Sequence, residues 1–326
     1  MTYIFKQSQQ YLIFIVAMLA LMLRGWAMLG PFEPVQRHNT YFSDQLLANL
    51  MSTHSQLFLA LLLTVGQAIL LNLLVKKYEL VYRHTWMPSL CYILCCSLTP
   101  SCDYLSPQMM CNTFIILGLW RLLGLYKSEF ANQHIFETGF LFGLCFVLRF
   151  EMIVLLPFLL IGINTLRVGN LREWAVLLSG YLLPVYLLVA MYYLNEQLPD
   201  AWQMVSANFY KNDFPVELFK NIRPWLASLV ALFIFLMGCL KLQANYNKGM
   251  LKIRKFQTLL ILMLPLLLLA AVLSYEDLQS GIIYMAAPSS VLMAYYFMGH
   301  EWAWWKEMLF WLLVGCILYP QLSFLG

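Results

Sequence analysis

The sequence predicts an all-α polytopic membrane protein with about eleven transmembrane helices, in a range of about ten to twelve, and a cytoplasmic amino terminus. Hydrophobic residues make up 62% of the chain and charged residues 11%, a composition that excludes a water-soluble domain of 326 residues. Long apolar runs follow one another from Tyr11 onward, and the gaps between them alternate between basic and acidic. We therefore expect residues 1–326 to form a single integral membrane domain.

The apolar runs suit helices through a hydrocarbon core of roughly 30 Å, which needs about 20 residues. Helices are expected because lipid offers no hydrogen-bond partner to an exposed backbone. The first run, Tyr11 to Leu29, is longer than the apolar part of a signal peptide, and no small-residue cleavage site follows it, so we expect it to remain as a span. The predicted spans are 11–29, 56–75, 86–99, 109–126, 135–148, 151–166, 174–194, 225–241, 257–274, 281–298 and 302–322.

Lysines and arginines orient these spans, because cytoplasmic gaps carry an excess of basic residues. With the amino terminus inside, thirteen of them fall in inner gaps and five in outer gaps. The inner set is Lys6, Lys76, Lys77, Arg83, Lys127, Arg167, Arg172, Lys241, Lys248, Lys252, Arg254, Lys255 and Lys306, and the outer set is Arg37, Arg149, Lys211, Lys220 and Arg223. All five aspartates (Asp44, Asp103, Asp200, Asp213, Asp277) fall outside, which indicates chemistry on the outer face.

The stretch from Phe136 to Leu166 is either one long tilted helix or two short ones. Basic residues flank it on both sides, so both flanks are expected inside and the number of crossings between them is even. Arg149 and Glu151 then lie at an outer hairpin tip. Because the first arm is short for a full crossing, we expect the tip below the membrane surface, shielded by other helices.

Two outer segments are long enough to hold structure of their own. Segment 30–55 ends with Leu46, Leu47 and Leu50, a spacing that suits a helix lying on the membrane surface. Segment 195–224 mixes aromatic and charged residues, which is an interfacial composition. Each is expected to contain an interfacial helix.

Ionisable residues inside apolar spans are functional candidates, because a charge at the bilayer centre costs at least about 2.5 to 3.5 kcal/mol. Arg24 and Arg121 lie near helix ends, from which their side chains are expected to reach the interface. Arg149 and Glu151 are two positions apart and do not face each other on a helix, so either the chain turns there or each finds another partner. They are a structural pair that caps the hairpin or a binding site for a substrate phosphate.

The first outer loop offers a second group of candidates, Glu33, Arg37, His38 and Asp44, within twelve residues. A carboxylate there suits deprotonation of an acceptor hydroxyl, and Arg37 or His38 suits neutralisation of a leaving phosphate. The alternative for each is a solvated or structural role. Asp103, in the next outer loop, is a candidate for a supporting role together with Glu151. The five histidines are not at ligand spacing and no Gly-rich phosphate loop is present, so we expect no metal site and no cofactor. The net charge of +4 is small and the basic residues are spread over several short gaps, so we expect no nucleic-acid partner.

Two segments resemble known membrane proteins. CFVLRFEMIVLLPFL, residues 145–159, is similar to the small-Leu-x-Arg-Pro-Glu-apolar-Pro stretch of multi-spanning glycosyltransferases of the GT-C type, with Phe150 in place of the usual proline. LSPQMMCNTFIILGLWRLLGLY, residues 105–126, looks like the span after a substrate-facing outer loop in these enzymes. The resemblance implies lipid-phosphate-linked sugar donors and a catalytic acid in the first outer loop, at Glu33 or Asp44. Glu33 stands alone between Pro31 and Pro34, unlike the usual acid in that family.

The whole chain also resembles an uncharacterised bacterial family of ten- or eleven-span proteins, through RHTWMPSLCYILCCSLTPSCDYLSP, GNLREWAVLLSGYLLPVYLL and APSSVLMAYYF. This resemblance implies the bacterial inner membrane and supplies no activity. The leading expectation is a GT-C-like glycosyltransferase that acts on polyprenyl-phosphate-linked sugars at the outer face. The alternatives are a non-enzymatic component of cell-envelope assembly or secretion, with envelope protein partners, and a lipid or solute transporter, which the absence of repeat symmetry disfavours.

Overall fold

The computed structural model describes residues 5, 11–29, 53–81, 85–98, 105–126, 128–167, 169–196, 199, 223–246, 250–274, 281–299 and 303–322. Within these residues every regular element is a helix, as the composition predicts. The elements run in the order α2 (Leu12–Leu29), α4 (Thr53–Lys77), α5 (Met87–Cys96), α6 (Pro107–Gly124), α7 (Ala131–Leu148), η2 (Phe150–Val154), α8 (Leu155–Leu166), α9 (Leu171–Leu194), α11 (Arg223–Tyr246), α12 (Leu251–Leu273), η4 (Ile283–Met285), α14 (Ala286–Met298) and α15 (Ala303–Leu322). Each predicted span overlaps one of the α-helices. Most of the two outer segments, 30–55 and 195–224, falls outside the described residues, so their interfacial helices stay predictions.

The helices differ in whether they are long enough to cross a membrane. Among the described residues, four stretches are long and apolar enough: Ser55–Lys77, Leu171–Leu194, Leu226–Ala244 and Leu251–Leu273. Helix α5 has ten residues, so at 1.5 Å per residue it is about 15 Å long, half of the hydrocarbon thickness. It begins next to Pro88 and ends before Ser97, whose hydroxyl donates to the carbonyl of Ile93 (2.8 Å). The helix is thus shorter than the predicted span 86–99.

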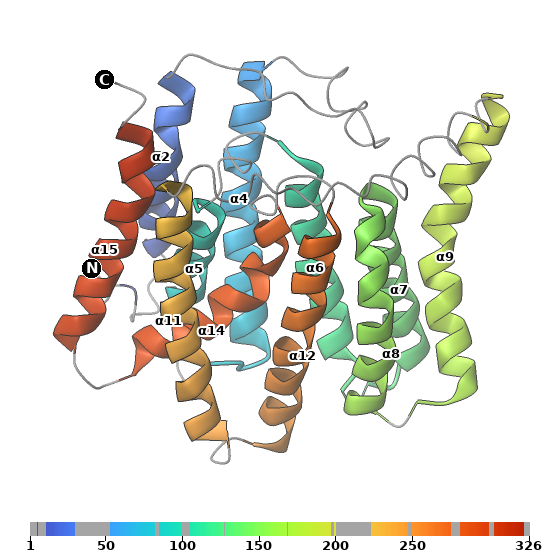
Figure 1. The fold of residues 1–326 in the computed structure, drawn as a ribbon. Coiled ribbons are helices and arrows are strands. Elements are labelled where there is room, and N and C mark those ends of the chain that lie inside the picture. Colours follow the sequence, from blue (N-terminus) through green and yellow to red (C-terminus); the bar gives the residue numbers. More distant parts are fainter. Residues whose placement is uncertain are drawn as a thin grey trace.

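The short helices α5 and α14 lie in the interior of the helix assembly. Figure 1 shows α15 at one edge and α9 at the other. Helix α5 packs between α4 and α14, and α14 packs against α11, which contacts α15. All residues of α5 are buried, as are most residues of α14. Neighbouring helices therefore surround these two.

Close backbone contacts join α7 to α9 at three glycines. On α7, Gly139 and Gly143 are four residues apart and share one face. A Cβ on Gly139 would overlap the carbonyl oxygen of Leu177, and a Cβ on Gly143 would overlap the carbonyl oxygen of Tyr181. Gly180 of α9 meets the backbone of α7 in the same way. Small residues at this spacing let two helix backbones approach closely, so the glycines account for how α9 is held at the edge of the assembly.

Basic residues gather at one end of the helices, which we call the basic end. It lies at the bottom of Figure 1, where α8 and α11 end and α9 and α12 begin. In the described part of the chain the basic end carries Lys76, Lys77, Arg121, Arg167, Arg172, Lys241, Lys252, Arg254, Lys255 and Lys306. Arg24, Arg149 and Arg223 lie toward the opposite end. The charge asymmetry along the sequence is thus an asymmetry between the two ends of the fold.

Candidate functional site

The chain breaks its helical path between α7 and α8, at the predicted hairpin tip. Helix α7 ends at Leu148, Arg149 is extended (φ −146°, ψ 116°), and the 3-10 turn η2 leads into α8. Pro157 lies in the first turn of α8, a position where its missing amide proton is tolerated. The two-helix interpretation of Phe136 to Leu166 is therefore correct.

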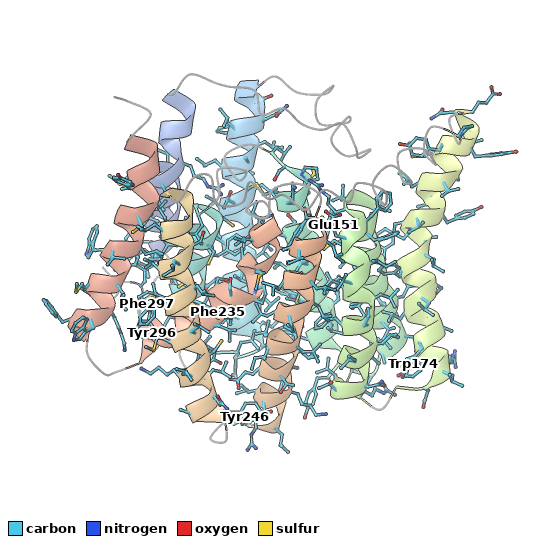
Figure 2. The ribbon with its side chains drawn as sticks, in the orientation of Figure 1. Glu151, Trp174, Phe235, Tyr246, Tyr296 and Phe297 are labelled. Atoms are coloured by element: carbon cyan, nitrogen blue, oxygen red, sulfur yellow. The ribbon has the colours of Figure 1, made fainter. Side chains whose placement is uncertain are left out.

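This break brings Arg149 and Glu151 together. Arg149 Nη1 lies 3.8 Å from Glu151 Oε1, and the side chains are only 1% and 2% exposed. The predicted turn of the chain is what allows two residues at this spacing to meet. In Figure 2, Glu151 lies below the upper ends of α2, α4 and α9. A buried arginine and a buried carboxylate at one helix break are the strongest candidate for a binding site in the described residues.

Burial makes this charge pair energetically important in either of its expected roles. Charges lose hydration when they are buried, and removing one partner of a buried pair costs about 3 to 5 kcal/mol because the other charge is left uncompensated. At 3.8 Å the two atoms are in ionic contact but beyond hydrogen-bond distance. A phosphate oxygen that approached Arg149 would compete with Glu151 for the guanidinium. The pair can therefore act as a switchable anion site or as a structural cap.

Arg24 is a second buried cation, and here the prediction from sequence is wrong. Its residue exposure is 4%, and its guanidinium donates to the hydroxyl of Thr64 and to the carbonyl oxygen of Cys96 (3.1 Å). It therefore links α2 to α4 and α5 instead of reaching the interface. Acceptors on neighbouring helices replaced the water that the prediction assumed. Arg121 differs from Arg24, since its side chain is 46% exposed and its Nε lies 3.0 Å from Glu137.

A buried amide network at Gln67 lies among α4, α5 and α6. Gln67 Nε2 donates to the carbonyl of Met109 (2.7 Å) and to Thr113 Oγ1 (2.7 Å), and Tyr92 donates to Gln67 Oε1 (2.8 Å). Asn112 on α6 donates to the carbonyl of Ile283 (2.8 Å). Neither Gln67 nor Asn112 carries a charge, so neither stands out among the ionisable residues of the apolar spans. An amide inside an apolar run is the signal that would have found them.

The remaining predicted site residues, Glu33, Arg37, His38, Asp44 and Asp103, lie outside the described residues. Of the predicted site, the structure therefore brings together Arg149 and Glu151. Within the described ranges, no group of three His, Cys, Asp or Glu side chains is placed to hold a metal ion. The buried cysteines that the structure describes are free thiols.

The fold and the helix lengths define the class: an all-helical protein with several helices long and apolar enough to cross a membrane. The chain belongs to the family of unknown function DUF6427, whose family model matches residues 42–323. No curated protein and no solved structure matches the chain.

Proposed function

We propose that this protein is a multi-pass inner-membrane glycosyltransferase of GT-C-like type, which uses a polyprenyl-phosphate-linked sugar at the outer face of a bacterial membrane. The observation that carries the proposal is the buried Arg149 beside Glu151 at the α7–η2 break, toward the end opposite the basic end. Irregular backbone at membrane depth is tolerated where it is buried in protein or lines a cavity, and a charged side chain there is a functional candidate.

The proposed reaction assigns one role to each group. Glu33 or Asp44 accepts the proton of an acceptor hydroxyl, whose oxygen attacks the anomeric carbon of the sugar. The bond between that carbon and the phosphate oxygen breaks, and polyprenyl phosphate leaves with the bonding electrons. Arg149, with Arg37 or His38, neutralises the negative charge on the leaving phosphate. Glu151 holds Arg149 when no substrate is bound, and Asp103 supports the acceptor side.

Lipid-linked intermediates in cells test this proposal. A deletion strain is complemented with wild type, Arg149→Gln, Glu33→Gln or Asp44→Asn, and protein levels in the membrane are measured for each. Arg121→Gln is the matched control, because it removes one arginine charge from an exposed position at the basic end. We expect a polyprenyl-linked sugar to accumulate in the deletion and in the Arg149→Gln strain, and not in the control. An unchanged lipid pool with full complementation by every variant contradicts the proposal.

The proposed topology has eleven crossings, an internal amino terminus and the basic end in the cytoplasm. It rests on the excess of lysine and arginine at that end. A reporter fused after residue 326 tests whether the number of crossings is odd. With eleven crossings the reporter lies on the outer side, so alkaline phosphatase should be active there and green fluorescent protein should not fluoresce. The reverse result would mean an even number of crossings, and the segment that contains the short helix α5 would be the first to reconsider.

One observation favours a second candidate, a non-enzymatic component of envelope assembly. Arg149 and Glu151 carry opposite charges 3.8 Å apart, and such a pair stabilises the hairpin without any ligand. For this candidate, Arg149→Gln lowers the amount of folded protein while the lipid-linked pool stays unchanged. The same complementation experiment therefore separates the two functions.

A further inference from the structure

Four aromatic side chains from three helical regions form a connected cluster at the basic end, which we call the aromatic platform. Tyr78 follows α4, Trp120 lies in the last turns of α6, Tyr126 follows α6, and Phe256 lies in the second turn of α12. The Tyr78 ring meets Trp120 at a centroid distance of 6.5 Å and Phe256 at 5.5 Å, and Phe256 meets Tyr126 at 5.9 Å, all edge to face. Tyr78 also donates its hydroxyl to the carbonyl of Trp120 (2.8 Å). The platform is thus held by packing and by a hydrogen bond.

Three lysine ammonium groups lie over this platform. Lys77 Nζ is 4.8 Å from the centroid of Trp120 and 5.5 Å from that of Tyr78. Lys252 Nζ is 5.8 Å from the centroid of Phe256, and Lys255 Nζ is 5.7 Å from that of Tyr126. Ring faces attract cations, so the platform holds three positive charges from α4 and α12 at one place.

These charges have no carboxylate partner in the described part of the chain. The ion pairs seen there involve Arg121, Arg149 and Arg167, and none involves one of the three lysines. Lys255 donates to the carbonyl of Leu166 (3.3 Å), which is a neutral acceptor. Aromatic rings attract the ammonium groups but carry no net negative charge. The platform therefore holds three positive charges and lacks a counter-anion.

The position of the cluster along the helices indicates what the anion is. The apolar stretch of α4 ends at Lys77, and that of α12 begins at Leu251, next to Lys252. The three lysines thus lie where two apolar helices reach the membrane surface, and this is the level of lipid phosphates. Basic pockets between helices at that level bind the headgroups of anionic lipids.

We propose that Lys77, Lys252 and Lys255 on the aromatic platform form a binding site for the phosphate headgroup of an anionic phospholipid. The lipid tails lie along α4 and α12, and the phosphate bridges the two helices through the three ammonium groups. The site is separate from the Arg149–Glu151 pair, at the other end of the fold. Its existence does not depend on the proposed transferase reaction.

Native mass spectrometry of the full-length protein in neutral detergent tests the site, with phosphatidylglycerol and phosphatidylcholine as probes. The test variant carries Lys77→Gln, Lys252→Gln and Lys255→Gln. The matched control carries Lys76→Gln, Arg172→Gln and Arg254→Gln, which removes the same charge from the same end of the fold. A third variant replaces the three site lysines with arginine and keeps the charge. Size-exclusion profiles establish that each variant is folded.

A direct contact between an ammonium group and a phosphate is worth about tenfold or more in affinity, so the triple glutamine variant should lose well over tenfold for phosphatidylglycerol, whereas basic residues outside the site make no such contact. Binding of phosphatidylcholine should not change, and the control and the arginine variant should stay close to wild type. Equal losses in the test variant and the control would overturn the proposal, because they would mean attraction by net charge alone. An equal loss of phosphatidylcholine binding in the test variant would overturn the assignment to an anionic headgroup.

Discussion

Replacing Gly139 with alanine tests the close contact between α7 and α9. An added Cβ would overlap the carbonyl oxygen of Leu177 and lie 3.1 Å from the amide nitrogen of Tyr181. Both atoms belong to the backbone of α9 and cannot rotate away as the end of a side chain can. The two helices must therefore separate, and a gap of about 0.5 to 1 Å already removes a quarter to a half of the dispersion attraction across it.

The magnitude follows from two opposing terms. Inserting a methyl group into a closely packed interface costs about 1 to 3 kcal/mol, and the rigidity of the contacted backbone places Gly139 in the upper part of that range. Alanine has a higher helix propensity than glycine, and this difference stabilises the folded helix by about 1 kcal/mol. Gly139→Ala should therefore lower the free energy of unfolding by about 1 to 2 kcal/mol. Gly180→Ala should behave alike, because its Cβ would overlap the carbonyl oxygen of Phe136.

Gly66→Ala on α4 is the matched control. A Cβ there meets nothing within 4 Å among the described residues, so this variant receives the propensity gain without the overlap. The assay is reversible unfolding of the purified protein by titration with a denaturing detergent, followed by tryptophan fluorescence. The difference between Gly139→Ala and Gly66→Ala isolates the overlap and should be about 2 to 3 kcal/mol. A difference below about 0.5 kcal/mol would refute the reasoning.

Three further predictions use the same unfolding assay. Thr64→Val removes an acceptor of the buried Arg24 and should lower the free energy of unfolding by about 1 to 3 kcal/mol. The control Thr165→Val, on an exposed face of α8, should lower it by less than about 0.5 kcal/mol. Equal effects of the two substitutions would contradict the buried contact. Glu79 has a left-handed backbone (φ 53°) just after α4, a position where glycine is preferred because other residues are strained there. Glu79→Gly should therefore raise the free energy of unfolding by about 0.5 to 1 kcal/mol. A decrease would contradict the backbone strain at Glu79. Desolvation raises the pKa of Tyr78 above its ordinary value of 10.0, so above pH 10 the unfolded chain releases this proton first and stability falls as pH rises. Tyr78→Phe should lose stability less steeply than wild type above pH 10, and parallel profiles would contradict this.

The hairpin between α7 and α8 shows how far reasoning from sequence reached. Basic flanks on both sides of Phe136 to Leu166 required an even number of crossings, and this was enough to place Arg149 and Glu151 at a turn. The structure confirms the turn and adds the distance of 3.8 Å between them. That distance depends on the extended backbone of Arg149 and on the 3-10 turn η2 that follows it, which a charge count does not contain.

Arg24 shows where such reasoning failed. Its position near a helix end predicted a side chain that reaches the interface, but it is buried against Thr64 and Cys96. The outcome depends on which helices surround α2, and those helices come from other parts of the chain. For the same reason the sequence did not reveal that α5 lies between α4 and α14, or that Gln67 gathers donors and acceptors from three helices.

The sequence by itself determined the all-helical class, the positions of the helices and the sorting of basic residues to one end. These properties are local, because hydropathy and charge act on each segment through the solvent or lipid around it. The tertiary structure alone decided which polar side chains are buried, which glycines face a neighbouring backbone and which lysines meet on the aromatic platform. Each of these depends on contacts between segments distant in sequence, and a single sequence carries no direct record of such contacts.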